Sequence, residues 1–344
     1  MKLNLSSKTI LIIEDYSVMR KSMKDMLYTL GAQYLFEAEN GHAAIAAMKK
    51  QKFDFILCDY NLGEGKNGQQ VLEEARHKKL IAYSAVFIIV SAHQSAIDVL
   101  CTIENKPDEY LTKPFNAHQL IRRLKKSIAR RDYFLEIKKD IVKDNLASAI
   151  FHCDTLLKTN NKATYTSLLK IRADLAVNTG DFDKASAIYQ QILEQRDLAW
   201  ARLGTGIIAF YQQDHQNAIA IFQQVISNHP IFLDSYDWLS KAYEELDQTD
   251  KAENTIIRAT EISPNSFFRQ KQLALLTTQT GNLKIAEQAY LAVIELGKYS
   301  VHKTPADFSG LAKVYYKTEK NDEVLLTLDS MRQQFPDNHE AELR

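Results

Sequence analysis

Several residues able to perform metal and phosphoryl chemistry follow short apolar runs of this sequence. Asp59 ends the run from Phe55 to Cys58, Glu14 and Asp15 follow Ile10–Ile13, Ser91 follows 85–90, and Lys113 follows 109–112. Three carboxylates in one cleft repel each other and stay ionised together only beside a divalent cation. Mg²⁺ prefers oxygen ligands and commonly joins carboxylates to a phosphate. Asp59 could then attack a phosphoryl donor, with Lys113 and Ser91 binding the phosphate oxygens.

The elements that must position these residues alternate between short strands and helices. We expect strands at 9–13, 34–38, 55–59, 85–90 and 109–112, and helices after them that begin near Ser17, Gly41, Val71 and Ala96, with a fifth after residue 116. Ser17 is predicted to be the N-cap of the first of these helices. This (βα)5 pattern predicts a flavodoxin-like α/β domain with a parallel sheet covered on both faces. Taken singly, each polar residue has a plainer interpretation as a turn residue, helix cap or solvated side chain. Their convergence at the carboxyl ends of the strands favours one functional site.

These residues resemble the receiver domain of two-component response regulators over about residues 8–131. The resemblance implies that Glu14, Asp15, Asp59 and the backbone carbonyl of Asn61 bind Mg²⁺ or Mn²⁺, and that Asp59 is the phosphoacceptor. It implies further that Ser91 and Tyr110 are switch residues, that Lys113 contacts the phosphoryl group, and that the Lys113–Pro114 peptide bond is cis.

Two features of the sequence depart from the common family pattern. The turn after Asp59 has Gly63 where proline is usual, and Gly68 comes one residue later than the commonest spacing, so the geometry of this loop is open. His93 lies two residues after Ser91, at a position that in the family tunes dephosphorylation. A plain loop histidine is an equal alternative.

The charge distribution and the cysteine content of the sequence argue against several classes of function. Residues 1–131 carry 20 Lys and Arg against 14 Asp and Glu, and residues 132–344 carry 23 against 29, giving +6 and −6. The acidic second half and the lack of a basic recognition helix argue against a nucleic-acid module. The three cysteines lack metal-ligand spacing, which disfavours a zinc site or a disulfide framework. No apolar run approaches the roughly 20 residues of a membrane helix, so we expect a cytoplasmic protein without membrane insertion.

The joint between the two halves has a helical character. Residues 116–179 contain neither glycine nor proline, so the sequence predicts that the last receiver helix runs into, or abuts, further helices and couples the domains rigidly. A helix with a kink at 130–132 is the alternative. We assign residues 1–131 to the receiver, 132–162 to a linker with atypical capping helices, and 163–344 to the second domain.

The second domain repeats with a period near 34 residues. Small residues at Ala185, Ala218, Ala252 and Ala286 are spaced by 33, 34 and 34 residues, and Val324 takes the equivalent place in a fifth unit. This segment resembles tetratricopeptide (TPR) repeats, whose paired helices stack into an α-solenoid with a concave groove. Groove positions on the first helices include Trp200, Leu203, Ile207, Phe210, Lys241, Phe268 and Lys271. The alternative is that the apolar members pack against a neighbouring repeat.

The combined sequence predicts a signal-relay protein. A histidine kinase or phosphotransfer protein would phosphorylate Asp59, and the repeats would bind a protein or peptide as the output. A phosphorylation-independent scaffold, or a phosphoryl sink that inhibits a kinase, is the alternative from another class. A transcription regulator acting through a protein partner is less favoured. We expect no enzymatic activity beyond self-phosphorylation and autodephosphorylation, and a homodimer is compatible with the sequence.

Overall fold

The computed structural model describes residues 4–92, 107–159 and 161–336. The chain forms two compact units, the first made of Met1–Ala149 with the short segment Tyr299–Val301, and the second of Ile150–Lys298 with His302–Arg344. The first unit is α/β and the second is all-helical, which confirms the predicted fold classes. None of the helices in the described ranges has both the length and the apolar character required to cross a bilayer.

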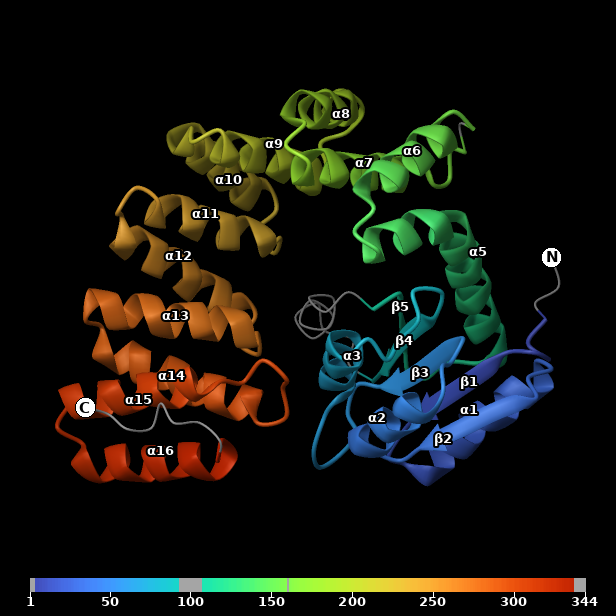
Figure 1. The fold of residues 1–344 in the computed structure, drawn as a ribbon, viewed down its shortest axis with the longest axis horizontal. Coiled ribbons are helices and arrows are strands. Elements are labelled where there is room, and N and C mark those ends of the chain that lie inside the picture. Colours follow the sequence, from blue (N-terminus) through green and yellow to red (C-terminus); the bar gives the residue numbers. More distant parts are fainter. Residues whose placement is uncertain (1–3, 93–106, 160, 337–344) are drawn as a thin grey trace. The chain divides into compact units, whose positions relative to one another are not determined.

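A five-stranded parallel sheet forms the centre of the first unit, with strand order β2-β1-β3-β4-β5 (Figure 1). The strands are β1 (Thr9–Ile13), β2 (Tyr34–Ala38), β3 (Phe55–Asp59), β4 (Val86–Ser91) and β5 (Glu109–Thr112). The helices described are α1 (Ser17–Thr29), α2 (Gly41–Lys50), α3 (Gly68–His77) and α5 (Ala117–Val142). Ser17 was expected to cap α1 but is its first helical residue; Tyr16 precedes it and makes no side-chain cap bond. The helix expected around 96–103 lies outside the described residues.

Alternate strand residues build the two cores that hold the sheet between its helices. Successive side chains of a strand point to opposite faces, so a continuous apolar strand buries one set under each helical layer. The first face packs Ile10, Ile12, Phe55, Leu57, Val86 and Ile88 against α1 and α5. The second packs Leu11, Ile13, Ile56, Cys58, Phe87 and Ile89 against α2 and α3. This packing fixes the position of the residue that ends each strand.

Helix α5 is unbroken from Ala117 to Val142 and so extends past residue 131, while the kink at 130–132 considered from the sequence stays a prediction. Phe134, Ile137 and Asp140 in its second half are buried. Ser148 donates a 2.6 Å hydrogen bond to the Asp140 carboxylate, which ties the end of α5 to the next helix. The extension is therefore a packed part of the first unit and not a free tether.

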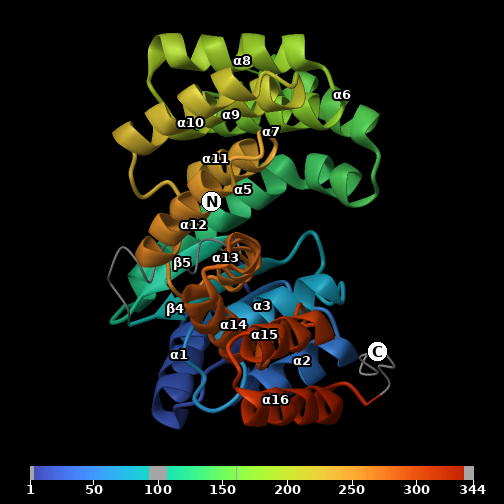
Figure 2. The same cartoon turned by 90° about the vertical axis from the view of Figure 1, so that its left-hand side faces the viewer.

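Paired helices stack in series through the second unit (Figures 1 and 2). They are α6 (Leu146–Leu157), α7 (Tyr165–Asn178), α8 (Phe182–Gln195), α9 (Ala199–Tyr211), α10 (His215–Asn228), α11 (Asp234–Glu244), α12 (Thr249–Ile262), α13 (Phe267–Thr280), α14 (Leu283–Gly297), α15 (Pro305–Lys317) and α16 (Asn321–Gln334). The four alanines that mark the period are fully buried. Small residues at these positions let neighbouring helices approach closely enough to share one core.

Glycines in the first helices of the repeats receive the large residues of the second helices. A Cβ atom on Gly204 of α9 would lie 2.2 Å from Cζ of Tyr189 in α8, and one on Gly310 of α15 would lie 2.4 Å from the ring of Tyr290 in α14. Both tyrosines are buried. The ring therefore occupies the space that any larger residue at the glycine position would need.

We expect Gly204→Ala to lower the free energy of unfolding of the repeats by about 1–3 kcal/mol, because the added methyl group overpacks a buried contact. The sign is informative, since the same change in an exposed helix stabilises by about 1 kcal/mol. Urea denaturation followed by circular dichroism measures the difference. Tyr189→Leu in the same chain should return part of the loss, and a stabilised Gly204→Ala chain would contradict the close packing.

Candidate functional site

The parallel sheet brings the expected site residues to one edge. Asp59 ends β3 beside Val90 of β4, and Ser91 ends β4 beside Thr112 of β5. Glu14 directly follows β1, where its backbone N–H continues the ladder to the Ala38 carbonyl at 3.1 Å. The carboxyl ends of neighbouring parallel strands necessarily meet, and a crevice there is the usual ligand site of open α/β sheets.

Lys113 bridges two of the three acids. Its Nζ atom lies 2.7 Å from Oε2 of Glu14 and 3.0 Å from Oδ2 of Asp59. Its backbone N–H donates to the Ser91 carbonyl at 2.7 Å, which fixes the start of the lysine segment against β4. The Lys113–Pro114 peptide bond is cis. A lysine held in this way places a fixed positive charge beside the Asp59 carboxylate.

Burial governs the protonation of these groups. Glu14 is 2% exposed and Asp59 is 7% exposed. Desolvation raises the pKa of both carboxyl groups, while the Lys113 ammonium group lowers it, with a net rise for each. Burial by itself lowers the pKa of Lys113, but its hydrogen bonds to Glu14 and Asp59 outweigh that effect and raise it overall. The crowded acids thus hold their charge only with the help of nearby cations.

Three acids form a cluster that fits a hard divalent cation. Glu14, Asp15 and Asp59 each offer a carboxylate oxygen, and these oxygens lie within 4.8 Å of one another. Lys113 supplies one positive charge against three negative ones, so the cluster keeps a negative excess. All the donors are oxygens, as Mg²⁺ and Mn²⁺ require. The side chain of Asn61 accepts a hydrogen bond from Gly63 N–H at 3.3 Å, and the role of its carbonyl in metal binding stays a prediction.

Arg20 supports the acidic pair and was not identified from the sequence. Its Nη1 atom donates to the backbone carbonyl of Glu14 at 2.6 Å and lies 3.3 Å from that of Asp15. Its Nε atom lies 3.4 Å from Oε2 of Glu37 in β2. Arg20 therefore holds the backbone from which both acids project. Its place one turn into the helix that follows the acids is a sequence signal that could have indicated it.

Gly68 packs closely against the backbone of Asp59 at the end of the turn that follows this residue. Its N–H donates to the Tyr60 carbonyl at 2.8 Å, and a Cβ atom at this position would lie 2.2 Å from the carbonyl oxygen of Asp59. Asn67 and Gln70 form a reciprocal capping box that begins α3 at this point. The helix thus starts in direct contact with the backbone of the candidate acceptor, and only glycine fits there.

The structure shows the positions of Ser91 and Tyr110, the two residues predicted to be switches. Ser91 is buried at 2% exposure, and Tyr110 in β5 is half-buried beside the core of the second face. Their movement on phosphorylation stays a prediction. His93 lies outside the described residues, so its role is also untested.

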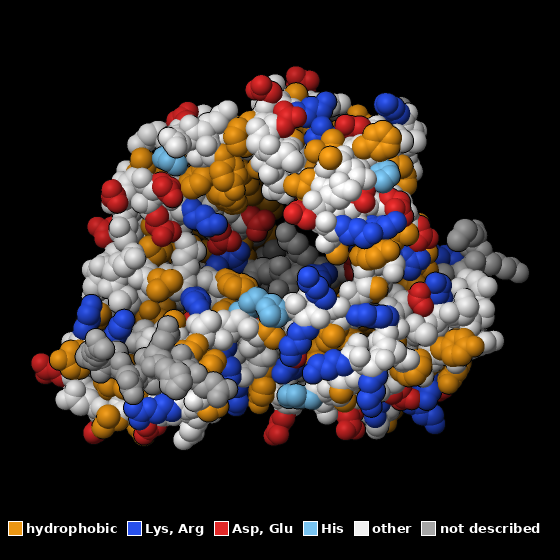
Figure 3. Space-filling view, in the orientation of Figure 1, with side chains coloured by type: hydrophobic (Ala, Val, Ile, Leu, Met, Phe, Trp, Pro, Cys, Tyr) orange, Lys and Arg blue, Asp and Glu red, His pale blue; other side chains and the backbone are white. Residues whose placement is uncertain are grey.

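The repeats distribute the expected groove residues differently from the sequence prediction. Leu203 is 6% exposed and belongs to the core, so its assignment to the groove was wrong. Trp200 packs edge-on against Tyr189, Phe210 packs edge-on against Trp238, and Ile207 is partly buried against the core. Figure 3 shows apolar side chains gathered over α9 and α10.

Polar and exposed groove candidates differ in their surroundings. Lys241 Nζ lies 4.8 Å from the ring centroid of Trp238, and Lys271 Nζ is ion-paired to Asp307 at 2.6 Å. Phe268 is 57% exposed. Only part of the expected groove set thus has side-chain surface available to a partner.

Comparison with known proteins gives independent information on both units. Residues 10–125 match the family described as response regulator receiver domain, and residues 200–230 and 233–266 match tetratricopeptide repeats. Chemotaxis protein CheY-3 of Vibrio cholerae is 31% identical over 121 residues, which span 35% of this chain and 92% of that protein. Aerobic respiration control protein ArcA of Escherichia coli is 29% identical over 121 residues, which span 35% of this chain and 48% of that protein. The solved structure of MamA protein is 17% identical, with a TM-score of 0.43 over 53% of this chain and 98% of that one.

Proposed function

Because this chain belongs to the response regulator receiver family through its first unit, we propose that it relays a phosphoryl signal from Asp59 to a protein bound by its TPR repeats. The observation that carries the proposal is the contact of Lys113 with both Asp59 and Glu14 at the edge of the sheet. This arrangement joins a nucleophilic carboxylate, a cation and a metal-binding acid pair in one cleft.

The proposed reaction is phosphoryl transfer to a carboxylate. One oxygen of Asp59 attacks the phosphorus atom of a phosphohistidine or small phosphodonor, the bond from phosphorus to the donor breaks, and the donor leaves with its electron pair. The product is an acyl phosphate on Asp59. A bound Mg²⁺ would neutralise charge on the phosphoryl oxygens. Glu14 and Asp15 would hold the ion, while Lys113 and the Ser91 hydroxyl bind phosphoryl oxygens.

The partners and the output follow from the two units. A histidine kinase or phosphotransfer protein would supply the phosphoryl group, and the repeats would bind a protein segment. Phosphorylation would then shift the receiver between two states, and the repeats would bind their partner differently in each. The proposal includes no catalytic activity of the repeats.

A binding experiment in two states of the receiver tests this output. We expect the immobilised full chain to capture its partner from a cell extract with at least a fivefold difference between samples with and without Mg²⁺ and beryllofluoride, which mimics the phosphoryl group; that ratio corresponds to a coupling free energy of about 1 kcal/mol. Quantitative mass spectrometry measures the ratio. The Asp59→Asn chain should show no difference. Equal capture by wild type in both states would favour a constitutive scaffold instead.

A further inference from the structure

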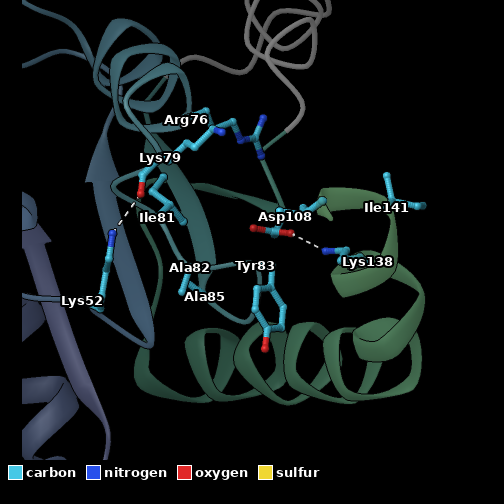
Figure 4. Close-up of a pocket in the computed structure, with 11 residues that line it drawn as sticks. Lys52, Arg76, Lys79, Ile81, Ala82, Tyr83, Ala85, Asp108, Lys138 and Ile141 are labelled. Carbon is cyan, nitrogen blue, oxygen red and sulfur yellow. Dashed lines mark hydrogen bonds and ion pairs between the residues drawn. The ribbon is translucent and has the colours of Figure 1, made fainter. Parts of the chain in front are cut away.

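A second pocket lies in the first unit, apart from the acidic cluster, and we propose that it binds a small organic anion with an aromatic body. Its volume is about 680 Å³. It lies between the end of α3, the segment that leads into β4, the start of β5 and the α5 extension (Figure 4). The volume falls within the range of about 300–1,000 Å³ that is typical of small-molecule sites.

Apolar side chains from two segments form the walls of this pocket. Ile81, Tyr83 and Ala85 come from the segment before β4, and Ile141 and Val142 come from the end of α5. Tyr83 is 42% exposed, Ile141 is 41% exposed and Val142 is 69% exposed. A ligand with a flat apolar body would remove part of this surface from water, which favours its binding.

Basic side chains dominate the charge of the lining. Lys52, Arg76, Lys79 and Lys138 contribute four positive charges, and Asp108 contributes one negative charge. Lys138 Nζ lies 3.3 Å from Oδ1 of Asp108, and the charge of Asp108 also acts on Arg76, so the one acid of the lining lies among basic side chains. The lining therefore has a formal excess of three positive charges. This excess favours an anion over a neutral or cationic ligand.

The pocket is a preformed part of the receiver unit. Asp108 accepts a hydrogen bond from Phe87 N–H of β4 at 2.9 Å, and Arg131 of α5 donates to the Ser84 carbonyl at 3.3 Å. Lys52 Nζ donates to the carbonyls of Lys79 and Leu80 at 2.9 and 2.8 Å. These contacts hold the walls in place before a ligand arrives, which lowers the ordering cost of binding.

The chemistry of the lining specifies the ligand class. An aromatic carboxylate can place its ring against the apolar part of the lining while its charge meets the basic side chains of α3 and the turn that follows, Arg76 and Lys79. Neither of these two contributes to the acidic cluster at the other edge of the sheet. The ligand class is thus independent of the phosphoryl chemistry proposed for Asp59.

Calorimetric titration of the full chain with 2-naphthoate tests the inference. We expect saturable one-to-one binding that weakens with added salt. The neutral analogue 2-naphthamide should bind about tenfold more weakly, since two surface charge contacts together contribute up to about tenfold in affinity. The double variant Arg76→Gln and Lys79→Gln should lose a similar factor for 2-naphthoate and little for 2-naphthamide.

A matched control separates this site from a general effect of charge. Lys125→Gln with Lys126→Gln removes the same two charges from α5 residues that do not line the pocket, and should leave 2-naphthoate binding unchanged. Ile141→Asp should weaken binding of both compounds without unfolding the chain, because Ile141 is partly exposed. No saturable binding, or equal loss in the two double variants, would overturn the site. Saturable binding of an acidic peptide, with no binding of 2-naphthoate, would assign the pocket to a protein partner instead.

Discussion

An Asp59→Asn chain incubated with acetyl phosphate and Mg²⁺ is expected to acquire no phosphoryl group, whereas the wild-type chain acquires one. An amide is not a nucleophile toward phosphorus, so the rate should fall by more than about three orders of magnitude, as it does when other catalytic nucleophiles are removed. Intact-protein mass spectrometry measures the modified fraction over time. The change keeps the size of the side chain, so the fold should persist.

Asp54→Asn provides the matched control for this experiment. Asp54 precedes the same strand at its opposite end, where it accepts hydrogen bonds from Lys8 Nζ at 2.9 Å and Thr9 N–H at 3.0 Å. Its replacement should lower stability through these lost contacts but leave phosphoryl uptake at Asp59 intact. Uptake by Asp59→Asn at the wild-type rate, or a label mapped to Glu14 or Asp15, would contradict the assignment of the acceptor.

The sheet edge could be predicted because strand ends follow from local pattern. Ile10–Ile13 and Phe55–Cys58 are continuous apolar runs, and in a parallel sheet such runs deliver the next residue to the same edge. The strand pattern alone therefore predicts that Glu14, Asp59 and Lys113 lie at the same edge, without any information on side-chain contacts. The 2.7 Å contact between Lys113 and Glu14 could not be predicted in this way, because the position of a strand does not determine which acid a long side chain contacts.

The errors have equally specific causes. Trp200, Leu203, Ile207 and Phe210 follow the spacing of one helix face, but that spacing does not distinguish a face turned to a groove from one turned to the next helix. Leu203 is on the packed side. Serine is a favoured N-cap residue, but Ser17 is already the first residue of the helix, and Tyr16 occupies the N-cap position. The 680 Å³ pocket joins Lys52 to Val142, and local periodicity carries no information about such distant neighbours.

We expect Gly68→Ala to impair both stability and phosphoryl uptake. A methyl group 2.2 Å from the Asp59 carbonyl oxygen, and 3.1 Å from Cys58 Sγ, must displace either the first turn of α3 or the backbone of the acceptor. Overpacking against backbone that cannot rotate away costs about 1–3 kcal/mol. A shift of about 1 Å in a reacting group can cost up to about a hundredfold in rate, so uptake should slow at least tenfold.

The Gly204→Ala chain serves as a control that separates the loss of stability in Gly68→Ala from its slower phosphoryl uptake. It introduces the same methyl group and a similar loss of stability in the second unit, where Gly204 meets Tyr189 and not the acceptor. Both chains are compared below their melting temperatures, with uptake measured by mass spectrometry and stability by thermal denaturation. Slow uptake in Gly68→Ala alone would locate the defect at the Asp59 backbone. Equal uptake in both variants would mean that α3 yields without moving the acceptor, and that the close approach of Gly68 serves the fold and not the transfer reaction.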